Sequence, residues 1–154
     1  MERIISILKE KGKTLSTMES CTGGGLVNSI TNIEGASEVI KFSAVTYSND
    51  FKIKMGVSNK VIDKYSVYSI ETAEEMSKNI SFFTNSNYGI GITGKLNRID
   101  INNQYGNDNT VFISIYDKEN SKFYNSSIEV KKSSRKDNKE EVINVVIKML
   151  NEII

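Results

Sequence analysis

The stretch TLSTMESCTGGGLVNSI, residues 14–30, has the pattern of a strand that passes through a glycine turn into a helix. Thr14 to Met18 is typical of a short strand, and Gly25 to Ile30 has helical spacing. The unpaired N–H groups at the start of such a helix can bind an anion, and glycines let a ligand approach the backbone. The stretch is equally compatible with a turn that sterics alone require.

Strands and helices alternate along the rest of the chain, and the last two strands have the alternating pattern of a hairpin. Residues 70–84 follow Ser69, a suitable N-cap, and Asp137 with Glu140 forms a capping box before the last helix. These patterns predict one α/β domain, residues 1–154, with a mixed sheet. We expect strands at 14–18, 39–47, 88–93, 110–117 and 122–130, and helices at 2–11, 25–30, 50–55, 59–65, 70–84 and 138–152.

The composition is that of a soluble globular protein. Of 154 residues, 38% are apolar and 25% charged, and the formal net charge of +1 gives no reason to expect a nucleic-acid partner. The chain has no run of apolar residues long enough to cross a membrane, and its N-terminal apolar segment is too short for a signal peptide. A single cysteine cannot form an internal disulfide. We therefore expect a cytoplasmic protein without a membrane partner.

The chain contains no histidine. This excludes Ser-His-Asp and Cys-His catalysis and, with a single cysteine, leaves too few ligands for a zinc site. No tight cluster of carboxylates indicates a magnesium site either, so we expect no metal and no cofactor. Any acid–base chemistry must therefore use Lys, Tyr, Asp or Glu.

Ser20 and Cys21 are both candidate nucleophiles in the glycine turn. A lone cysteine is most often a buried packing residue, and a serine before a helix is often only a cap. Without histidine, the base that activates either side chain must be a lysine or a carboxylate. A lysine can act as a base near neutral pH only where burial lowers its pKa by several units. We therefore expect a site lysine near a strand end or a helix start.

The stretch TYSNDFK, residues 46–52, meets this condition because it follows the β-rich run VIKFSAV. Lys52 is its candidate base, Tyr47 could hydrogen-bond a neutral lysine, and Asn49 could orient a substrate amide or hydroxyl. The alternative is an N-cap at Ser48 or Asn49 followed by a solvated lysine, and the residues of this stretch alone favour it.

Two further motifs have simpler interpretations. GIGITG, residues 89–94, matches a dinucleotide-binding pattern, but its first two glycines lie inside the strand rather than after it. Its small residues are better explained by close packing. The basic run KKSSRKDNK, residues 131–139, is typical of a solvated approach to a helix, with phosphate binding by Arg135 or Lys139 as the less favoured alternative.

Taken together, four stretches resemble one family, and they occur in its order and spacing. The chain is similar over nearly its whole length to the CinA C-terminal domain family, whose free-standing members are nicotinamide-nucleotide amidases. ESCTGG followed at this distance by YSN-x-x-K is the most specific part of the resemblance. The four stretches are ESCTGG (19–24), AVTYSNDFK (44–52), MGVSNKVIDKYSVYSIETAEEM (55–76) and GIGITG (89–94).

The resemblance implies a three-layer α/β/α fold with a five-stranded mixed sheet, in a chain that forms a homodimer. It also implies a small-molecule nucleotide substrate. The family hydrolyses the carboxamide of nicotinamide mononucleotide to nicotinate mononucleotide and ammonia, in pyridine-nucleotide salvage and without a metal.

The resemblance also assigns roles by matching position. Ser20 would be the nucleophile, Lys52 its general base, and Tyr47 the residue that holds the lysine or relays a proton. Backbone N–H groups of Thr22, Gly23 and Gly24 would stabilise the oxyanion, and Ser48, Asn49, Thr93 and Gly94 would line the pocket.

Two stretches depart from the family pattern. ITGKLNRIDINNQYGNDNTVFI, residues 92–113, replaces a loop with glycine and proline, and KDNKEE, residues 136–141, stands where the family favours Gly-Asp-Arg, with Arg135 displaced. Both differences concern the substrate side more than the nucleophile. Two alternatives therefore stay open: a non-catalytic nucleotide-binding or protein-interaction module of the same fold, and an amidase with a different substrate.

Overall fold

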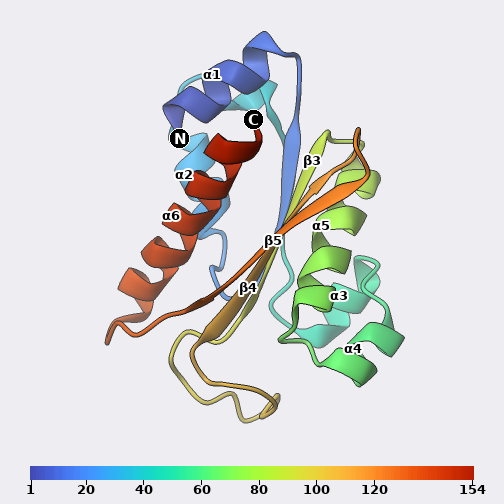
Figure 1. Ribbon diagram of the computed structural model, residues 1–154, viewed down its shortest axis with the longest axis vertical. Helices are drawn as coiled ribbons and strands as arrows, with labels where there is room; N and C mark the ends of the chain where they lie inside the picture. The colour runs from blue at the N-terminus through green and yellow to red at the C-terminus, as the bar shows by residue number, and fades with distance from the viewer.

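The computed structural model describes all 154 residues as three layers, with a central sheet between two sets of helices (Figure 1). Helices α1, α2 and α6 cover one face of the sheet, and α3, α4 and α5 lie on the other. The strands are β1 (Leu15–Glu19), β2 (Ile40–Val45), β3 (Tyr88–Gly94), β4 (Thr110–Asp117) and β5 (Lys122–Glu129). The helices are α1 (Glu2–Glu10), α2 (Gly25–Thr31), α3 (Asn49–Lys54), α4 (Asn59–Tyr65), α5 (Ile70–Thr84) and α6 (Arg135–Ile153), with a 3-10 helix at Ala36–Glu38.

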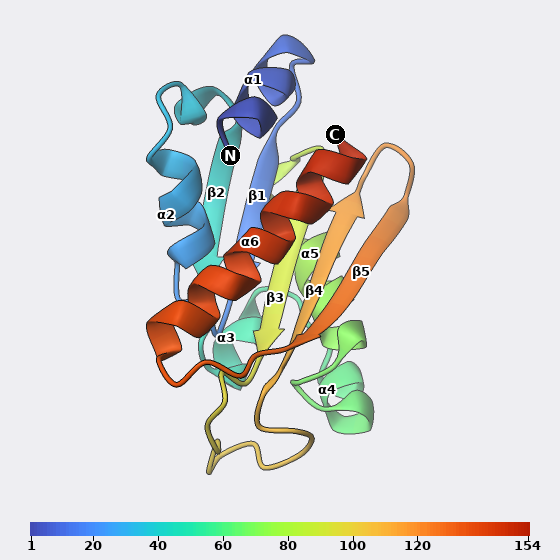
Figure 2. The same ribbon diagram turned by 60° about the vertical axis from the view of Figure 1, so that its left-hand side comes forward.

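The five strands form one mixed sheet, as the resemblance implied, and their order in it is β2-β1-β3-β4-β5. β1 is parallel to both β2 and β3, while β4 and β5 run antiparallel as a hairpin. After β1 the chain first forms β2 on one side of β1, and later forms β3 on the other side. The carboxyl ends of β1 and β3 therefore flank a topological switch point, where open α/β sheets bind ligands. Figure 2 shows the loop after β3 at this end of the sheet, beside α3.

Most of the core lies between the sheet and the layer of α1, α2 and α6, where 20 buried apolar side chains form one cluster. A smaller cluster on the other face includes Met18 of β1 and Met76 of α5. Helix α5 approaches β3 very closely, because a Cβ at Gly89 would lie 1.9 Å from the Ser77 carbonyl oxygen. At Gly91 it would lie 2.3 Å from the carbonyl oxygen of Ala73. The glycines of GIGITG thus allow close packing, as the sequence predicted.

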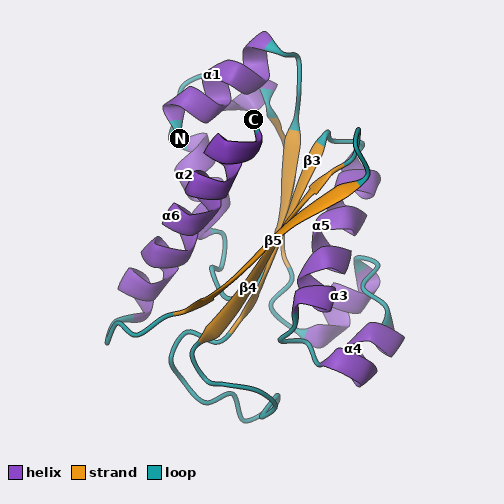
Figure 3. Ribbon diagram, in the orientation of Figure 1, coloured by secondary structure: helices purple, strands orange, loops and turns teal.

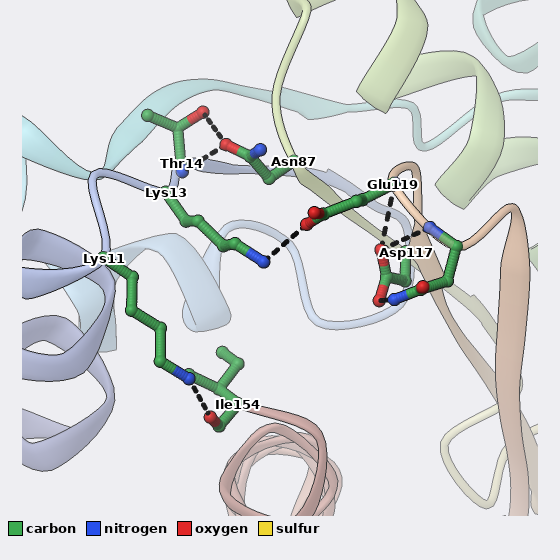
Figure 4. Close-up of polar contacts among 8 residues, drawn as sticks. Lys11, Lys13, Thr14, Asn87, Asp117, Glu119 and Ile154 are labelled. Atoms are coloured by element: carbon green, nitrogen blue, oxygen red, sulfur yellow. Dashed lines mark hydrogen bonds and ion pairs between the residues drawn. The ribbon is translucent and has the colours of Figure 1, made fainter.

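Polar contacts join several segments at the end of the sheet where β1 and β3 begin (Figure 4). The Lys13 amine lies 2.6 Å from the carboxylate of Glu119 in the β4–β5 turn, and Lys11 donates to the backbone oxygen of Ile154 at 2.8 Å. Asn87, just before β3, accepts from the backbone N–H of Thr14 at 2.9 Å. The Asn87 contact joins the N-terminal ends of β1 and β3, and the two lysine contacts tie the segment before β1 to the β4–β5 turn and to the last residue.

The last helix begins one turn earlier than expected. Its N-cap is Ser134, whose hydroxyl accepts from the backbone N–H of Asp137, so the prediction of Asp137 as N-cap and a start at 138 was wrong. Ser134 with Asp137 three positions on is itself a capping pattern, and residues 135–138 of the basic run form the first turn. The early start also places Asn138 in a buried position, where its side chain hydrogen-bonds both backbone groups of Lys132.

The other expected elements agree with the structure within about two residues at each end. Figure 3 shows that the longest loop, between β3 and β4, lies at the end of the sheet where β3 finishes. No helix in the chain has both the length and the apolar content that a membrane crossing requires.

Candidate active site

Ser20 follows β1 directly and is held at the carboxyl end of the sheet. Its backbone N–H donates to the carbonyl of Ile92 in β3 at 3.0 Å, which continues the parallel pairing by one residue. Its own carbonyl accepts from the N–H of Gly23 at 3.0 Å and closes the turn. Ser20 is 6% exposed, so the residue is almost fully buried.

Lys52 reaches Ser20 from α3. Ser48 caps this helix, since its hydroxyl accepts from the backbone N–H of Phe51, and Lys52 lies one turn further on. The amine of Lys52 lies 3.0 Å from the Ser20 hydroxyl oxygen and 2.6 Å from the backbone carbonyl oxygen of Thr46. Lys52 is only 1% exposed, so the alternative of a solvated helical lysine was wrong. The structure brings together the two side chains that the resemblance paired.

The environment of Lys52 disfavours its charged form. Burial lowers the pKa of the amine to about 8, against a smaller opposing effect of nearby Cys21 and Asp100. No carboxylate lies within ion-pair distance of the amine. A neutral amine satisfies this site well, because it can donate to Thr46 and accept the hydroxyl proton of Ser20.

Glu19 occupies the start of α2. Its buried carboxylate accepts from the backbone N–H groups of Gly24 and Leu26, both at 3.1 Å, and of Val27 at 2.8 Å. It also accepts from the Thr22 hydroxyl at 2.7 Å. A carboxylate at a helix N-terminus is favourable because it satisfies unpaired donors and opposes the helix dipole. The possible anion site of the glycine turn is therefore filled from within the chain, and no phosphate cradle is left.

The backbone N–H groups that are free in this turn differ in part from the oxyanion donors that the resemblance implied. The N–H groups of Gly23 and Gly24 already donate to the Ser20 carbonyl and to Glu19, so these two are not free. The N–H groups of Cys21 and Thr22 form no hydrogen bond within the chain, and they follow Ser20 directly. We therefore assign the free donors of this turn to Cys21 and Thr22.

Cys21 is a packing residue rather than a competing nucleophile. It is 5% exposed and belongs to the main core cluster. Burial raises the pKa of its thiol to about 12, more than the Lys52 amine lowers it. Because the thiolate is the reactive form, we expect this thiol to react slowly near neutral pH.

Some of the other expected site residues lie where they were expected, and others do not. Tyr47 does not hydrogen-bond Lys52; it is exposed, and its hydroxyl accepts from Arg135 at 3.3 Å. The contact expected of Tyr47 is made instead by the backbone carbonyl of Thr46. Thr93 is fully buried and donates to the Val67 carbonyl at 2.9 Å, so it does not line the cavity. Ser48, Asn49 and Gly94 do line it.

A cavity of about 530 Å³ lies beside Ser20, within the usual size range of small-molecule sites. The loop after β3 supplies much of its wall, including residues that the sequence interpretation did not single out. A polar loop at a strand's carboxyl end was the only sequence signal for them. The lining residues are Ser20, Cys21, Tyr47, Ser48, Asn49, Tyr68, Gly94, Lys95, Leu96, Arg98, Ile99, Asp100, Asn102, Asn103 and Arg135.

Cations outnumber anions on the cavity wall. Lys95, Arg98 and Arg135 all line it, whereas Asp100 is its one carboxylate. Lys95 is buried, with its amine 3.0 Å from Asp108 and 5.2 Å from the centre of the Tyr68 ring. The cavity therefore suits an anionic ligand. Arg135 is exposed in the first turn of α6, as expected for the solvated basic run, and it also lies on the cavity wall. No group of three His, Cys, Asp or Glu side chains in the chain could hold a metal ion.

Comparison with protein families finds one match over the whole chain. The model of the CinA C-terminal domain matches residues 1–154. A putative competence-damage inducible protein of Caldanaerobacter subterraneus subsp. tengcongensis is 44% identical over 94 residues, which are 60% of this chain and 23% of the relative. A CinA-like protein of Flavobacterium psychrophilum is 40% identical over 112 residues, which are 71% of this chain and 26% of that protein. The matched segments span about a quarter of the length of these relatives.

Solved structures share the fold. The competence/damage inducible protein CihA of Agrobacterium tumefaciens superposes with a TM-score of 0.87 at 25% identity, over 97% of this chain and 90% of that chain. A CinA superfamily protein of Klebsiella pneumoniae superposes with a TM-score of 0.89 at 20% identity, over 98% and 92% of the two chains. The second likeness concerns the fold alone.

Proposed function

Because the chain belongs to the CinA C-terminal domain family, we propose that it hydrolyses the carboxamide of nicotinamide mononucleotide. The products are nicotinate mononucleotide and ammonia. The observation that carries this proposal is the contact of 3.0 Å between the hydroxyl of Ser20 and a buried lysine amine without a carboxylate partner. Such a lysine is a base that works without histidine.

The first half of the reaction forms an acyl-enzyme. Neutral Lys52 takes the proton of the Ser20 hydroxyl, and the oxygen attacks the carboxamide carbon. The free N–H groups of Cys21 and Thr22 stabilise the negative charge that develops on the carbonyl oxygen. The C–N bond then breaks, the Lys52 ammonium returns its proton to the leaving nitrogen, and ammonia departs from a nicotinoyl ester of Ser20.

The second half uses the same residues with water as the nucleophile. Lys52 takes a proton from water, the hydroxide attacks the ester carbon, and the proton returns to the Ser20 oxygen as the C–O bond breaks. With a pKa of about 8, roughly one-tenth of Lys52 is neutral at pH 7. The base therefore needs no further activation.

The cavity wall supports a nucleotide as the substrate. The phosphate of nicotinamide mononucleotide would lie toward the exposed Arg98 and Arg135, away from the buried Ser20, since Asp108 already pairs with Lys95. Asp100 is the one carboxylate on this wall. Most of these residues lie in the loop that departs from the family pattern, which also favours a second candidate, an amidase of the same mechanism with another anionic amide as substrate.

The test is a turnover assay with matched variants. The purified chain is incubated with nicotinamide mononucleotide while ammonia and nicotinate mononucleotide are measured. Ser20→Ala and Lys52→Ala should each lower kcat by about a thousandfold, because nucleophile and base act as one unit. Lys54→Ala, which removes an exposed lysine of the same helix, is the control. Mass spectrometry after acid quench should detect the nicotinoyl ester on Ser20.

Three results would change the proposal. Turnover that survives Ser20→Ala would contradict the mechanism. Binding without turnover by the unmodified chain would favour the non-catalytic module. Turnover of other amides but not of nicotinamide mononucleotide would favour the second candidate.

A further inference from the structure

A chain of hydrogen bonds runs along the cavity wall from Tyr68 to Asn49. The Tyr68 hydroxyl donates to the Asp100 carboxylate, and the side-chain amide of Asn103 donates to the same oxygen at 3.0 Å. The amide nitrogen of Asn49 in turn donates to the amide oxygen of Asn103 at 2.9 Å. All four residues line the cavity, and Asp100 and Asn103 come from the loop that departs from the family pattern.

The Asp100 carboxylate sets the direction in which these hydrogen bonds are donated. Burial raises its pKa, but hydrogen bonds from Tyr68, Asn103 and Asn102 outweigh burial and hold the pKa below its usual value. Ionised Asp100 can only accept, so Asn103 turns its nitrogen toward Asp100 and its oxygen toward Asn49. Asn49 must then use its nitrogen for Asn103, and its own oxygen has no partner within the chain.

We infer that Asp100, acting through Asn103, holds the Asn49 amide oxygen free to accept a hydrogen bond from the NH₂ group of a carboxamide substrate. This inference rests on the proposed amidase function. The carboxylate product has no N–H group, and its oxygens would face the oxygen of Asn49. The cavity therefore prefers the amide over the acid and favours release of the product. Asn49 contacts the substrate, while Asp100 and Asn103 are positioning residues.

Replacing Asp100 by asparagine should reverse the direction of donation along this row of hydrogen bonds. The backbone N–H of Asn102 donates to the Oδ1 atom of Asp100 at 2.9 Å, so the oxygen of the new amide stays at that position. Its nitrogen then takes the place of Oδ2, where the Tyr68 hydroxyl can rotate to accept. Asn103 must turn its oxygen toward the new nitrogen, and Asn49 must turn its NH₂ group to the cavity. An NH₂ group of Asn49 that faces the cavity favours the binding of a carboxylate, which can only accept hydrogen bonds.

The test measures the affinities of nicotinamide mononucleotide and nicotinate mononucleotide by calorimetry, in a Ser20→Ala background that prevents turnover. Asp100→Asn should weaken amide binding, tighten acid binding and shift the preference at least tenfold, about the effect of one hydrogen bond to a charged group. Asn103→Leu leaves the charge unchanged and frees Asn49 to turn, so it should shift the preference the same way but less. Asp50→Asn, an exposed carboxylate in the first turn of α3, is the charge-matched control.

A substitution that only loosened the loop would weaken the binding of both ligands alike. Equal losses of affinity, or an unchanged preference between amide and acid, would therefore overturn the inference. An equal shift of the preference in Asp50→Asn would also overturn it, because the shift would then follow from net charge alone. Failure of the unmodified site to bind either ligand would also overturn it. Turnover is measured separately in the chain that retains Ser20. A shift in preference without any turnover supports the inference and contradicts the amidase, and turnover without a shift does the reverse.

Discussion

The amine of Lys52 lies 3.0 Å from the hydroxyl of Ser20, in a chain that contains no histidine. The lysine is fully enclosed, and its only other partner is the backbone carbonyl of Thr46. A buried amine without a counter-charge is unfavourable when protonated. The feature that would make Lys52 a base therefore also has a cost in stability.

That cost should depend on pH. The pKa of Lys52 is about 8 in the folded chain, against an ordinary value of 10.5, so the unfolded chain binds more protons between these values. The free energy of unfolding contributed by Lys52 therefore rises with pH across this window, by about 3 kcal/mol in all. Urea denaturation of the unmodified chain and of Lys52→Met at pH 7 and pH 10 measures it. The unmodified chain should gain stability relative to the variant, and an equal response of both would contradict the shifted pKa.

The thiol of Cys21 should react far more slowly in the folded chain than in the unfolded one. Burial raises its pKa from 9.0 to about 12, which lowers the thiolate fraction about a thousandfold at pH 8. The rate of modification by a disulfide reagent, with and without urea, tests this. Comparable rates in both conditions would make Cys21 a competing nucleophile.

Glu19→Gln should destabilise the fold by at least about 2 kcal/mol. The amide nitrogen of glutamine would face backbone N–H groups that now donate to a carboxylate, which leaves buried donors unpaired. Thermal and urea denaturation measure the change, with Glu10→Gln at an exposed position as the control. If both variants were equally stable, the assignment of Glu19 as the internal anion of α2 would be wrong.

Gly89→Ala should destabilise the chain by at least about 3 kcal/mol. The added Cβ would meet the backbone oxygen of Ser77 at 1.9 Å, and a backbone atom of a packed helix cannot move aside alone. Gly25→Ala is the matched control, since its Cβ would meet only the mobile end of the Ile143 side chain at 2.9 Å. A mild effect at Gly89 would contradict the close approach of α5 to β3.

Much of the fold follows from local pattern. Apolar periodicity and caps such as Ser69 located the helices and the five strands, and the resemblance added the three-layer arrangement. The start of α6 was misplaced because Ser134 and Asp137 are both good caps and only the buried contacts of Asn138 decide between them.

The site was predictable where it depends on sequence motifs and not where it depends on tertiary contacts. Ser20 and Lys52 were paired by resemblance, and their contact is present. Nothing local indicates that Glu19 folds back onto α2, or that Tyr47 meets Arg135, 88 positions away. The polar loop after β3 has no periodicity, so the roles of Asp100 and Asn103 emerge only from their hydrogen bonds.

The pH dependence of kcat/KM for nicotinamide mononucleotide tests the central claim most directly, because it reports the protonation state of the base in the free protein. If neutral Lys52 activates Ser20, kcat/KM should rise with pH through an apparent pKa near 8 and then level off. A rise that begins only near pH 10, or a profile without this step, would contradict a buried neutral lysine as the base.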